Sequence, residues 1–380
     1  MSLPPQPLAL PPPPSAEQFA RLAGKSSASN LLANKFLAAE NEPRRQAAAA
    51  AAPAPGHTPG QLMGPFHSST PTYSSTLNGT FRLDQYHPLE EIYGFLEQLA
   101  RRYPRRVQLF TIGQTAEGRP IRALELKNNA SDGDYVWLDA LTHAREWITA
   151  TTMLYTIDQL VAGGRPDAAL FAKNYIIIPV VNPDGYAYTW STNRMWRKNR
   201  SRSQGSKCSG ADLNRNFDHS FRGEGASAEP CSHIYAGAYP NSEAETRALS
   251  ELMWSLKDRI KFYLTMHSFN QLWACPYAHT TESSAHLGTH MRVLRQIQQA
   301  VYQTEGVHYE IGPLSTSLYV GSGFGIDFAY DKCAIVHSYL VELRDRGQRG
   351  FVLPPDEIMP TARETLAGLH AGLRAVFGGL

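Results

Sequence analysis

Residues 141–147 read Leu141-Thr142-His143-Ala144-Arg145-Glu146-Trp147, and they join two segments of different periodicity. The preceding run, Val136 to Ala140, is short and mostly apolar, which predicts a buried strand. The following run, Trp147 to Val161, predicts a helix that ends before Gly163-Gly164. A buried strand leading into a helix is the unit from which parallel α/β sheets are built.

The rest of the chain repeats this alternation. Further buried strands are predicted at Tyr175–Val181, which the turn Asn182–Gly185 closes, and at Lys261–Ser268 and Ala334–Leu343. Further helices are predicted at His87–Tyr103, from a capping box at Ser242–Glu245 through Lys257, and over Pro355–Phe377 with an interruption near Pro360. The pattern predicts helices around a largely parallel or mixed sheet.

The first 78 residues differ in composition, with prolines at Pro11–Pro14 and an alanine run at Ala47–Ala52. Such a segment buries too little apolar area to offset its ordering entropy. We therefore predict a disordered extension over 1–78 and one catalytic domain over 79–380. A pro-segment or docking tail is the alternative for the extension, and no secretory signal pattern is visible at the start.

Overall charge limits the class of protein. Lys and Arg number 36 against 34 Asp and Glu, a balance of +2, which argues against a dedicated nucleic-acid binder. We therefore interpret the basic run Asn193–Arg200 as a solvated loop, or as arginines that face an anionic transition state. Both interpretations are preferred to a nucleic-acid-binding patch. No stretch approaches the roughly 20 apolar residues that cross a bilayer.

His143 and Glu146 suggest a metal site. Three residues apart, they can turn an imidazole nitrogen and a carboxylate oxygen toward one point, as zinc requires. A surface histidine beside a first-turn glutamate that the helix dipole favours would give the same pattern. His267, at the end of another predicted strand, shifts the balance, because two histidines and one glutamate leave a zinc position open for water.

Glu342 lies in an otherwise apolar strand and is a candidate general base, with pairing to Arg344 as the alternative. Asn214 and Arg215 are suited to bind a substrate carboxylate.

Together these motifs resemble the zinc metallocarboxypeptidases of the carboxypeptidase A type, peptidase family M14. The resemblance runs from Tyr86 to the C-terminus and rests on Glu117–Pro120, Thr142–Ile148, Val181–Tyr186, Asn193–Lys198, Asp212–Phe217, His267–Ser268 and Glu342–Asp345. It implies an α/β fold with a mixed, mainly parallel eight-stranded sheet sandwiched by helices. It also implies a zinc site at the carboxyl ends of central strands.

The resemblance assigns roles residue by residue. One Zn²⁺ would be held by His143, Glu146 and His267. Glu342 would act as base toward the water that zinc activates and then as acid toward the leaving amine, while Arg197 would stabilise the oxyanion. The terminal carboxylate of a peptide or protein substrate would be bound by Asn214, Arg215 and Tyr319, with auxiliary anion sites at Arg145 and Arg194.

Selectivity is assigned to Ile326, which would form the floor of the specificity pocket. Apolar walls at Leu314, Leu318 and Leu340, and room for a ring at Gly321, imply release of aromatic or aliphatic residues. Lys and Arg would be disfavoured, since isoleucine cannot neutralise a buried cation. Asp327 would point away from the pocket. The alternatives are an inactive peptide-binding pseudoenzyme and a carboxypeptidase of different terminal preference.

The resemblance also implies a disulfide between Cys208 and Cys231. Cys275 and Cys333 are expected to be buried thiols, with a second bridge as the alternative. The pairing favours an extracellular or secreted protein, the alternative being cytoplasmic. A monomer is expected, and the folded inhibitory pro-domain of the family has no recognisable counterpart in the Pro/Ala-rich segment.

Overall fold

The computed structural model describes residues 75, 80–128, 133–162 and 173–378. The segment 1–78 predicted as an extension therefore lies outside the described residues, apart from Ser75. That residue is buried; its N–H donates to the Phe81 carbonyl at 2.7 Å and its hydroxyl to Asp158. Ser75 thus contacts the packed domain, and the division of the chain at residue 79 stays a prediction.

An eight-stranded mixed sheet forms the centre of the molecule, as predicted. Its order is β1-β2-β4-β3-β5-β8-β6-β7. The strands are β1 Val107–Gln114, β2 Pro120–Leu126, β3 Tyr135–Ala140, β4 Asn174–Ile178, β5 Ile260–Ser268, β6 Leu272–Cys275, β7 Glu310–Pro313 and β8 Ser338–Leu343. The four central strands β4, β3, β5 and β8 are parallel, and β6 pairs parallel with β7. Antiparallel pairs join β1 to β2, β2 to β4, and β8 to β6.

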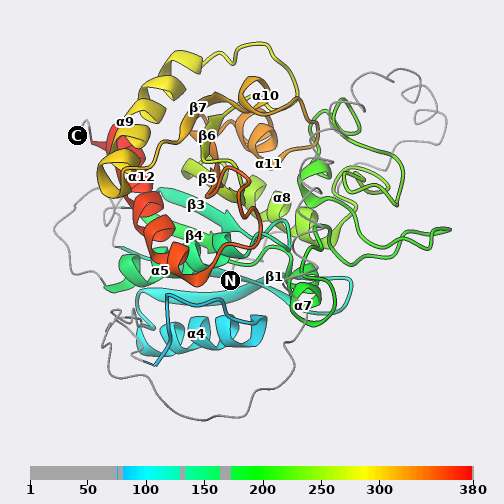
Figure 1. Cartoon of the computed structure of the whole chain (residues 1–380), viewed down its shortest axis with the longest axis horizontal. Helices are drawn as coiled ribbons and strands as arrows, with labels where there is room; N and C mark the ends of the chain where they lie inside the picture. Colours follow the sequence, from blue (N-terminus) through cyan, green and yellow to red (C-terminus); the bar gives the residue numbers. More distant parts are fainter. Residues whose placement is uncertain (1–74, 76–79, 129–132, 163–172, 379–380) are drawn as a thin grey trace, which may run out of the picture.

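Helices cover both faces of this sheet (Figure 1). They are α4 Leu89–Arg102, α5 Trp147–Ala162, α7 Pro183–Ser191, α8 Ala244–Leu256, α9 Leu287–Glu305 and α12 Ile358–Phe377, with short turns α10 Leu314–Ser317 and α11 Gly325–Asp327. Helices α4, α5, α9 and α12 share one hydrophobic cluster, and α8 belongs to a second. Helices α9 and α12 pack side by side at one edge.

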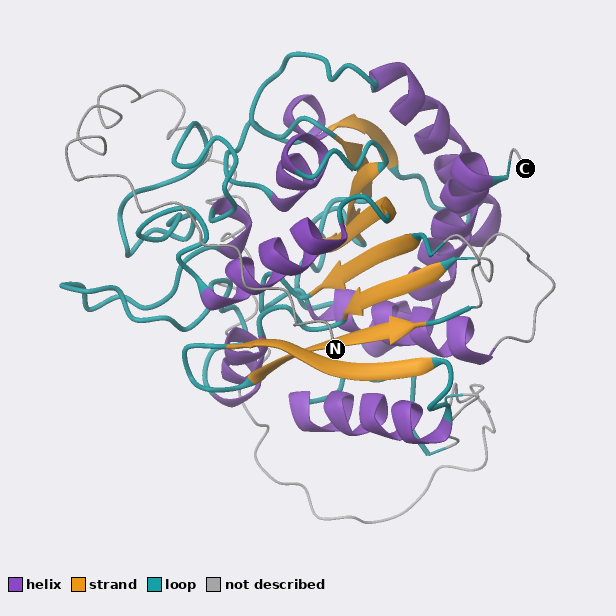
Figure 2. Ribbon diagram, turned by 180° about the vertical axis from the view of Figure 1, so that it is seen from behind, coloured by secondary structure: helices purple, strands orange, loops and turns teal. Residues whose placement is uncertain are grey.

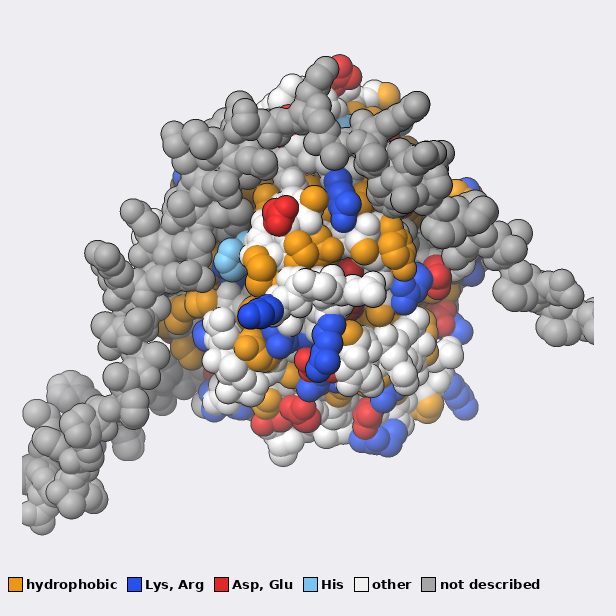
Figure 3. All heavy atoms as spheres, turned by 90° about the vertical axis from the view of Figure 1, so that its right-hand side faces the viewer, with side chains coloured by type: hydrophobic (Ala, Val, Ile, Leu, Met, Phe, Trp, Pro, Cys, Tyr) orange, Lys and Arg blue, Asp and Glu red, His pale blue; other side chains and the backbone are white. Residues whose placement is uncertain are grey.

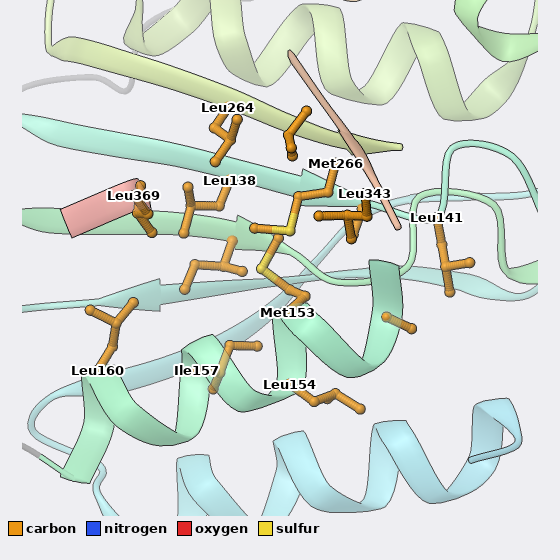
Figure 4. Packing of buried hydrophobic residues seen from close by; sticks show 14 of the residues in the cluster. Leu138, Leu141, Met153, Leu154, Ile157, Leu160, Leu264, Met266, Leu343 and Leu369 are labelled. Atoms are coloured by element: carbon orange, nitrogen blue, oxygen red, sulfur yellow. The ribbon is translucent and has the colours of Figure 1, made fainter. Parts of the chain in front are cut away.

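Strand β3 shows why the sheet is sandwiched. All six of its residues are buried, and they alternate between the two clusters: Val136 and Leu138 face the α5 side, and Trp137 faces the α8 side. Figure 4 shows Met153 and Ile157 of α5 packed toward the sheet. Each fully buried side chain of this size contributes about 1.5–3 kcal/mol, which holds α5 on the sheet.

Three local predictions are wrong in detail. Residues 182–185 do not close a strand as a turn; they begin α7, because the Asn182 side chain accepts the Gly185 N–H at 2.9 Å and Pro183 takes a first-turn position. Ser242 caps no helix, since its hydroxyl donates to the Glu243 carboxylate and Glu243 is the N-cap of α8. Pro360 does not interrupt α12, because it lies in the first turn, where a missing N–H costs nothing.

The sheet brings the candidate residues to one edge. The central parallel strands run in the same direction, so their carboxyl ends meet on the side of the long loops (Figure 2). His143 follows β3, while His267 and Glu342 are register partners near the ends of β5 and β8. Strand β3 connects to β4 on one side, and β5 lies on its other side. Such a reversal of strand order is a topological switch point, where α/β sheets form a binding crevice at the carboxyl ends of their strands.

Candidate metal centre

The three predicted ligands meet in space. Nδ1 of His143 lies 2.7 Å from Oε1 of Glu146, and Nδ1 of His267 lies 3.1 Å from Nδ1 of His143 and 3.2 Å from Oε2 of Glu146. All three side chains are buried. Residues that are far apart in the chain therefore present two imidazole nitrogens and a carboxylate to one point.

Local backbone structure places these side chains. Leu141 has a φ of 54°, which turns the chain out of β3, and its N–H donates to the Thr149 hydroxyl at 3.2 Å. The same hydroxyl donates to the Glu146 carbonyl at 2.8 Å, so the first turn of α5 is tied to the end of β3. From β5, the Ser268 N–H donates to Oε2 of Glu146 at 3.1 Å. The glutamate is thus oriented from both strands.

Asp212 orients the first histidine, and its role was missed by the sequence prediction. Nε2 of His143 donates to Oδ1 of Asp212 at 3.1 Å, while Oδ2 of Asp212 accepts from Nε and Nη2 of Arg197 at 3.1 and 3.0 Å. Fixing one ring nitrogen in this way leaves the other, Nδ1, available as a ligand. Asp212 lies in a quoted motif, but no local signal connects it to a histidine 69 positions away.

The second histidine is held by a buried polar chain. Nε2 of His267 lies 3.4 Å from the Thr265 hydroxyl, which donates to Oδ1 of Asp139 at 2.5 Å. Burial raises the pKa of Asp139 to about 6, against the lowering effect of hydrogen bonds from Thr265 and Trp137. Asp139 accepts hydrogen bonds from the Thr265 hydroxyl and the Trp137 Nε1–H at the end of this chain.

The charges in the cluster fit a divalent cation. Burial alone would raise the pKa of Glu146, but the imidazoles of His143 and His267 outweigh it and hold that pKa below its usual range. Burial lowers the pKa of His267, which favours the neutral ring that metals bind. Two imidazoles and a carboxylate, converging and buried, are a donor set suited to Zn²⁺.

The cluster opens into a cavity that is lined by four of the other predicted residues. Its lining includes Arg197, Asn214, Tyr319 and Glu342 beside the cluster. Arg344, the alternative partner for Glu342, is engaged elsewhere: all three of its guanidinium nitrogens donate to Glu357 or Glu364. Because Arg344 pairs with these two glutamates, the structure favours Glu342 as a residue of the cavity over Glu342 as the ion-pair partner of Arg344.

Among the described residues, Arg215 does not line the cavity, and it is only 1% exposed. Its Nε donates to the Gly225 carbonyl at 2.8 Å, Nη1 to the Asn214 carbonyl at 2.9 Å and Nη2 to the Tyr319 hydroxyl at 3.0 Å. Of the three residues assigned to bind the terminal carboxylate, Arg215 contacts Tyr319 and directly follows Asn214 in the sequence.

Arg145 and Arg194 lie next to each other, and neither lines the cavity among the described residues. The Arg145 guanidinium stacks on the Phe351 ring at 3.9 Å, and that of Arg194 stacks on the Trp147 ring at 3.8 Å. Arg194 also donates to the carbonyls of Arg145 and Phe351. Arg197 and Lys198 are buried as well, so the basic run faces inward rather than forming an exposed strip. An anion-binding role for Arg145 and Arg194 stays a prediction.

The assignment of Ile326 to the floor of a specificity pocket stays a prediction, and the structure shows what surrounds it. The room expected at Gly321 is filled, because a Cβ placed there would lie 2.5 Å from Cε2 of Phe324. Among the described residues, Phe324 and Leu318 line the cavity but Ile326 does not, and none of the Ile326 surface is exposed. The sequence prediction did not consider that the Phe324 ring packs into the space beside Gly321. Asp327 does point away, since its carboxylate accepts the N–H groups of Ala278 and His279.

The predicted disulfide is present between Cys208 and Cys231. Cys275 and Cys333 are buried free thiols, as favoured by the sequence prediction, and burial raises the pKa of each to about 12.

The surface around the carboxyl ends of the strands carries both apolar and cationic groups. Figure 3 shows hydrophobic side chains interspersed with Lys and Arg across the middle of this face. In the part of the chain that the structure describes, no helix has the length and apolarity to cross a membrane.

Comparison with known proteins agrees with this geometry. A family model described as zinc carboxypeptidase matches residues 92–368. Mouse carboxypeptidase A4 is 40% identical over 297 residues, which cover 77% of this chain and 70% of the mouse protein. The solved structure of bovine thrombin-activatable fibrinolysis inhibitor, in complex with tick carboxypeptidase inhibitor, is 36% identical with a TM-score of 0.74 and covers 78% of this chain and 99% of that one. Carboxypeptidase A from Helicoverpa armigera is 31% identical with a TM-score of 0.74, over 79% and 75% of the two chains.

Proposed function

The chain belongs to the zinc carboxypeptidase family and is a metallocarboxypeptidase, and from this premise we propose that it releases apolar residues from peptide C-termini with Glu342 as general base. The observation that carries the proposal is the cavity in which His143 and Glu146 of the cluster adjoin Glu342, Asn214 and Tyr319, with Arg215 hydrogen-bonded to the Tyr319 hydroxyl.

Zinc bound by the cluster would supply a Lewis acid that polarises the scissile carbonyl and makes water more acidic. Glu342 takes a proton from the attacking water and returns it to the departing amine. Arg197 faces the cluster, with Nη1 4.0 Å from Oε1 of Glu146, and donates hydrogen bonds to the developing oxyanion. Asp212 holds Arg197 in that orientation.

Arg215 makes the reaction an exopeptidase reaction. Its buried guanidinium binds the terminal carboxylate together with Asn214 and Tyr319. An internal peptide bond offers no carboxylate, and the buried cation would then lose its charged partner. The lining at Leu318 and Phe324 is apolar, which favours aromatic or aliphatic terminal residues over Lys, Arg or Glu.

The first test is Glu342→Gln. We expect this variant to keep zinc and to lose about 10²–10⁴ in kcat, since proton transfer accounts for a factor of that size. His143→Ala is the contrasting variant and should lose the metal itself. Metal content and turnover of blocked dipeptides are measured on both, and a Glu342→Gln enzyme with near wild-type turnover would leave Glu342 without a catalytic role.

The second test is selectivity. Otherwise identical peptides ending in Leu, Phe, Arg, Lys or Glu are compared, and we expect the best apolar peptide to exceed Arg at least about 100-fold in kcat/KM. Faster release of Arg would refute the apolar assignment. Binding of all peptides without turnover would instead identify a pseudoenzyme. The disulfide supports an extracellular setting for the enzyme.

A further inference from the structure

Phe324 occupies the place where a large terminal side chain would be expected to enter. Its ring is buried, yet it lines the cavity beside Leu318 and Tyr319. Ile326, two residues on, is completely enclosed and does not line the cavity among the described residues. Phe324 therefore contributes to the apolar lining of the cavity together with Leu318 and Phe269.

Glycines at 321 and 323 precede Phe324 at positions where a side chain would collide with its neighbours. Gly323 has a φ of 75°, and a Cβ there would lie 2.1 Å from the Arg215 carbonyl oxygen. This segment of chain therefore runs directly against the backbone of Arg215. Gly321 provides the hollow into which the ring fits, because any side chain at 321 would collide with Phe324.

The ring also packs on the group that would bind the terminal carboxylate. The Arg215 guanidinium carbon lies 4.3 Å from the centroid of Phe324, and the Tyr319 ring lies edge-on to Phe324 at 6.4 Å between centroids. A ring on the face of a guanidinium does not cover the in-plane directions of its N–H groups, so the Phe324 ring itself does not block carboxylate binding. It does stand next to the point from which the terminal side chain extends.

We propose that Phe324, rather than Ile326, determines terminal-residue selectivity by shortening the pocket, so that aliphatic residues such as Val and Leu are released in preference to Phe and Trp. This inference rests on the proposed exopeptidase function and specifies the substrate of the same site. An aromatic terminal side chain would have to displace the Phe324 ring from Gly321 and Arg215, and close-packed surroundings resist such insertion.

The first experiment uses the zinc-loaded wild-type enzyme and peptides that differ only in a terminal Val, Leu, Phe or Trp. Differences of one or a few methylenes in an apolar pocket are worth about 10–200-fold, so we expect Leu to exceed Phe at least about 10-fold in kcat/KM, and Trp to be slower still. Equal or faster release of Phe would overturn the proposal. It would leave the proposed function standing, which fails only if no C-terminal residue is released or if Arg exceeds every apolar residue.

Phe324→Ala tests the residue itself. We expect the ratio of kcat/KM for Phe over Leu to rise at least about 10-fold, because the hollow at Gly321 becomes available to the substrate ring. Any general loss from a less well-supported Arg215 affects both peptides and cancels in the ratio. Phe324→Leu, which retains bulk without the planar ring, should give an intermediate ratio and serves if the alanine variant does not fold.

Phe328→Ala is the matched control. Phe328 is a buried ring of the same segment, packed on Phe217 at 5.7 Å between centroids, and it does not line the cavity among the described residues. Its removal should cost stability and leave the Phe-to-Leu ratio unchanged. A ratio that shifts equally in both variants, or in neither Phe324 variant, would refute the assignment.

Discussion

Replacing Asp212 by Asn should weaken zinc binding although Asp212 is not a ligand. Its carboxylate is completely buried and accepts hydrogen bonds from His143, from two nitrogens of Arg197 and from the Asn214 N–H. Asparagine keeps the shape but places a neutral amide beside these donors. The charge that orients His143 and balances Arg197 is lost.

The expected magnitude follows from those contacts. Loss of the partner that orients a metal-binding histidine typically costs 10- to 100-fold in metal affinity, or about 1.4–2.7 kcal/mol. Breaking one side of a buried ion pair costs about 3–5 kcal/mol of folding stability. Both effects should appear in Asp212→Asn, and at saturating zinc its kcat should still be below that of wild type, because Arg197 has lost its orienting partner.

Asp184→Asn separates the two effects. Asp184 is also a fully buried carboxylate, which accepts from Thr115, the Glu117 N–H and Arg119, but it does not contact the cluster. It should lower the free energy of unfolding in urea without changing zinc affinity, measured by competition with a chelator. If Asp212→Asn binds zinc within twofold of wild type, or loses affinity no more than Asp184→Asn, the orienting role of Asp212 is refuted.

Two further predictions concern stability. Burial, together with His290, His286 and Arg292, lowers the pKa of His337 to about 4. Between pH 4 and 6.5 the folded state therefore binds fewer protons than the unfolded state. The free energy of unfolding rises with pH across that window, and this contribution is lost on acidification. His337→Gln should flatten the pH dependence of the unfolding free energy by up to about 2 kcal/mol, allowing for partial solvent screening, and an unchanged difference between pH 4.5 and 7 would contradict this. The disulfide closes a loop over a sequence separation of 23. The double variant Cys208→Ser and Cys231→Ser should therefore lower the free energy of unfolding in urea by about 3 kcal/mol. A decrease below about 1 kcal/mol would argue against a chain-entropy effect.

The central elements could be predicted because their signals are local. The all-buried β3 has a short apolar run, and α5 follows it directly, so the sequence around His143 and Glu146 predicts both the strand and the helix. Strands β1, β2, β6 and β7 were not predicted. The two outer strands β1 and β7 are only partly buried, and β6 and β7 have four residues each, which is too short for periodicity to identify.

The ligand set itself was predicted from the sequence, since the identities and order of His143, Glu146 and His267 follow ordered motifs of a family. Their convergence required the sheet, because the parallel register of β3 and β5 brings together residues 121 positions apart. The link from His143 through Asp212 to Arg197 is likewise a product of tertiary packing.

The shape of the specificity pocket was decided by the tertiary structure alone. Sequence position indicated that Ile326 is apolar and that Gly321 has no side chain, and both statements are correct. Which group fills the space beside a glycine depends on the path of the neighbouring backbone and on the rotamer that packing allows. At Gly321 that group is Phe324, whose ring packs on the Arg215 guanidinium. Gly323 brings this segment close to Arg215, because a Cβ at 323 would lie 2.1 Å from the Arg215 carbonyl oxygen.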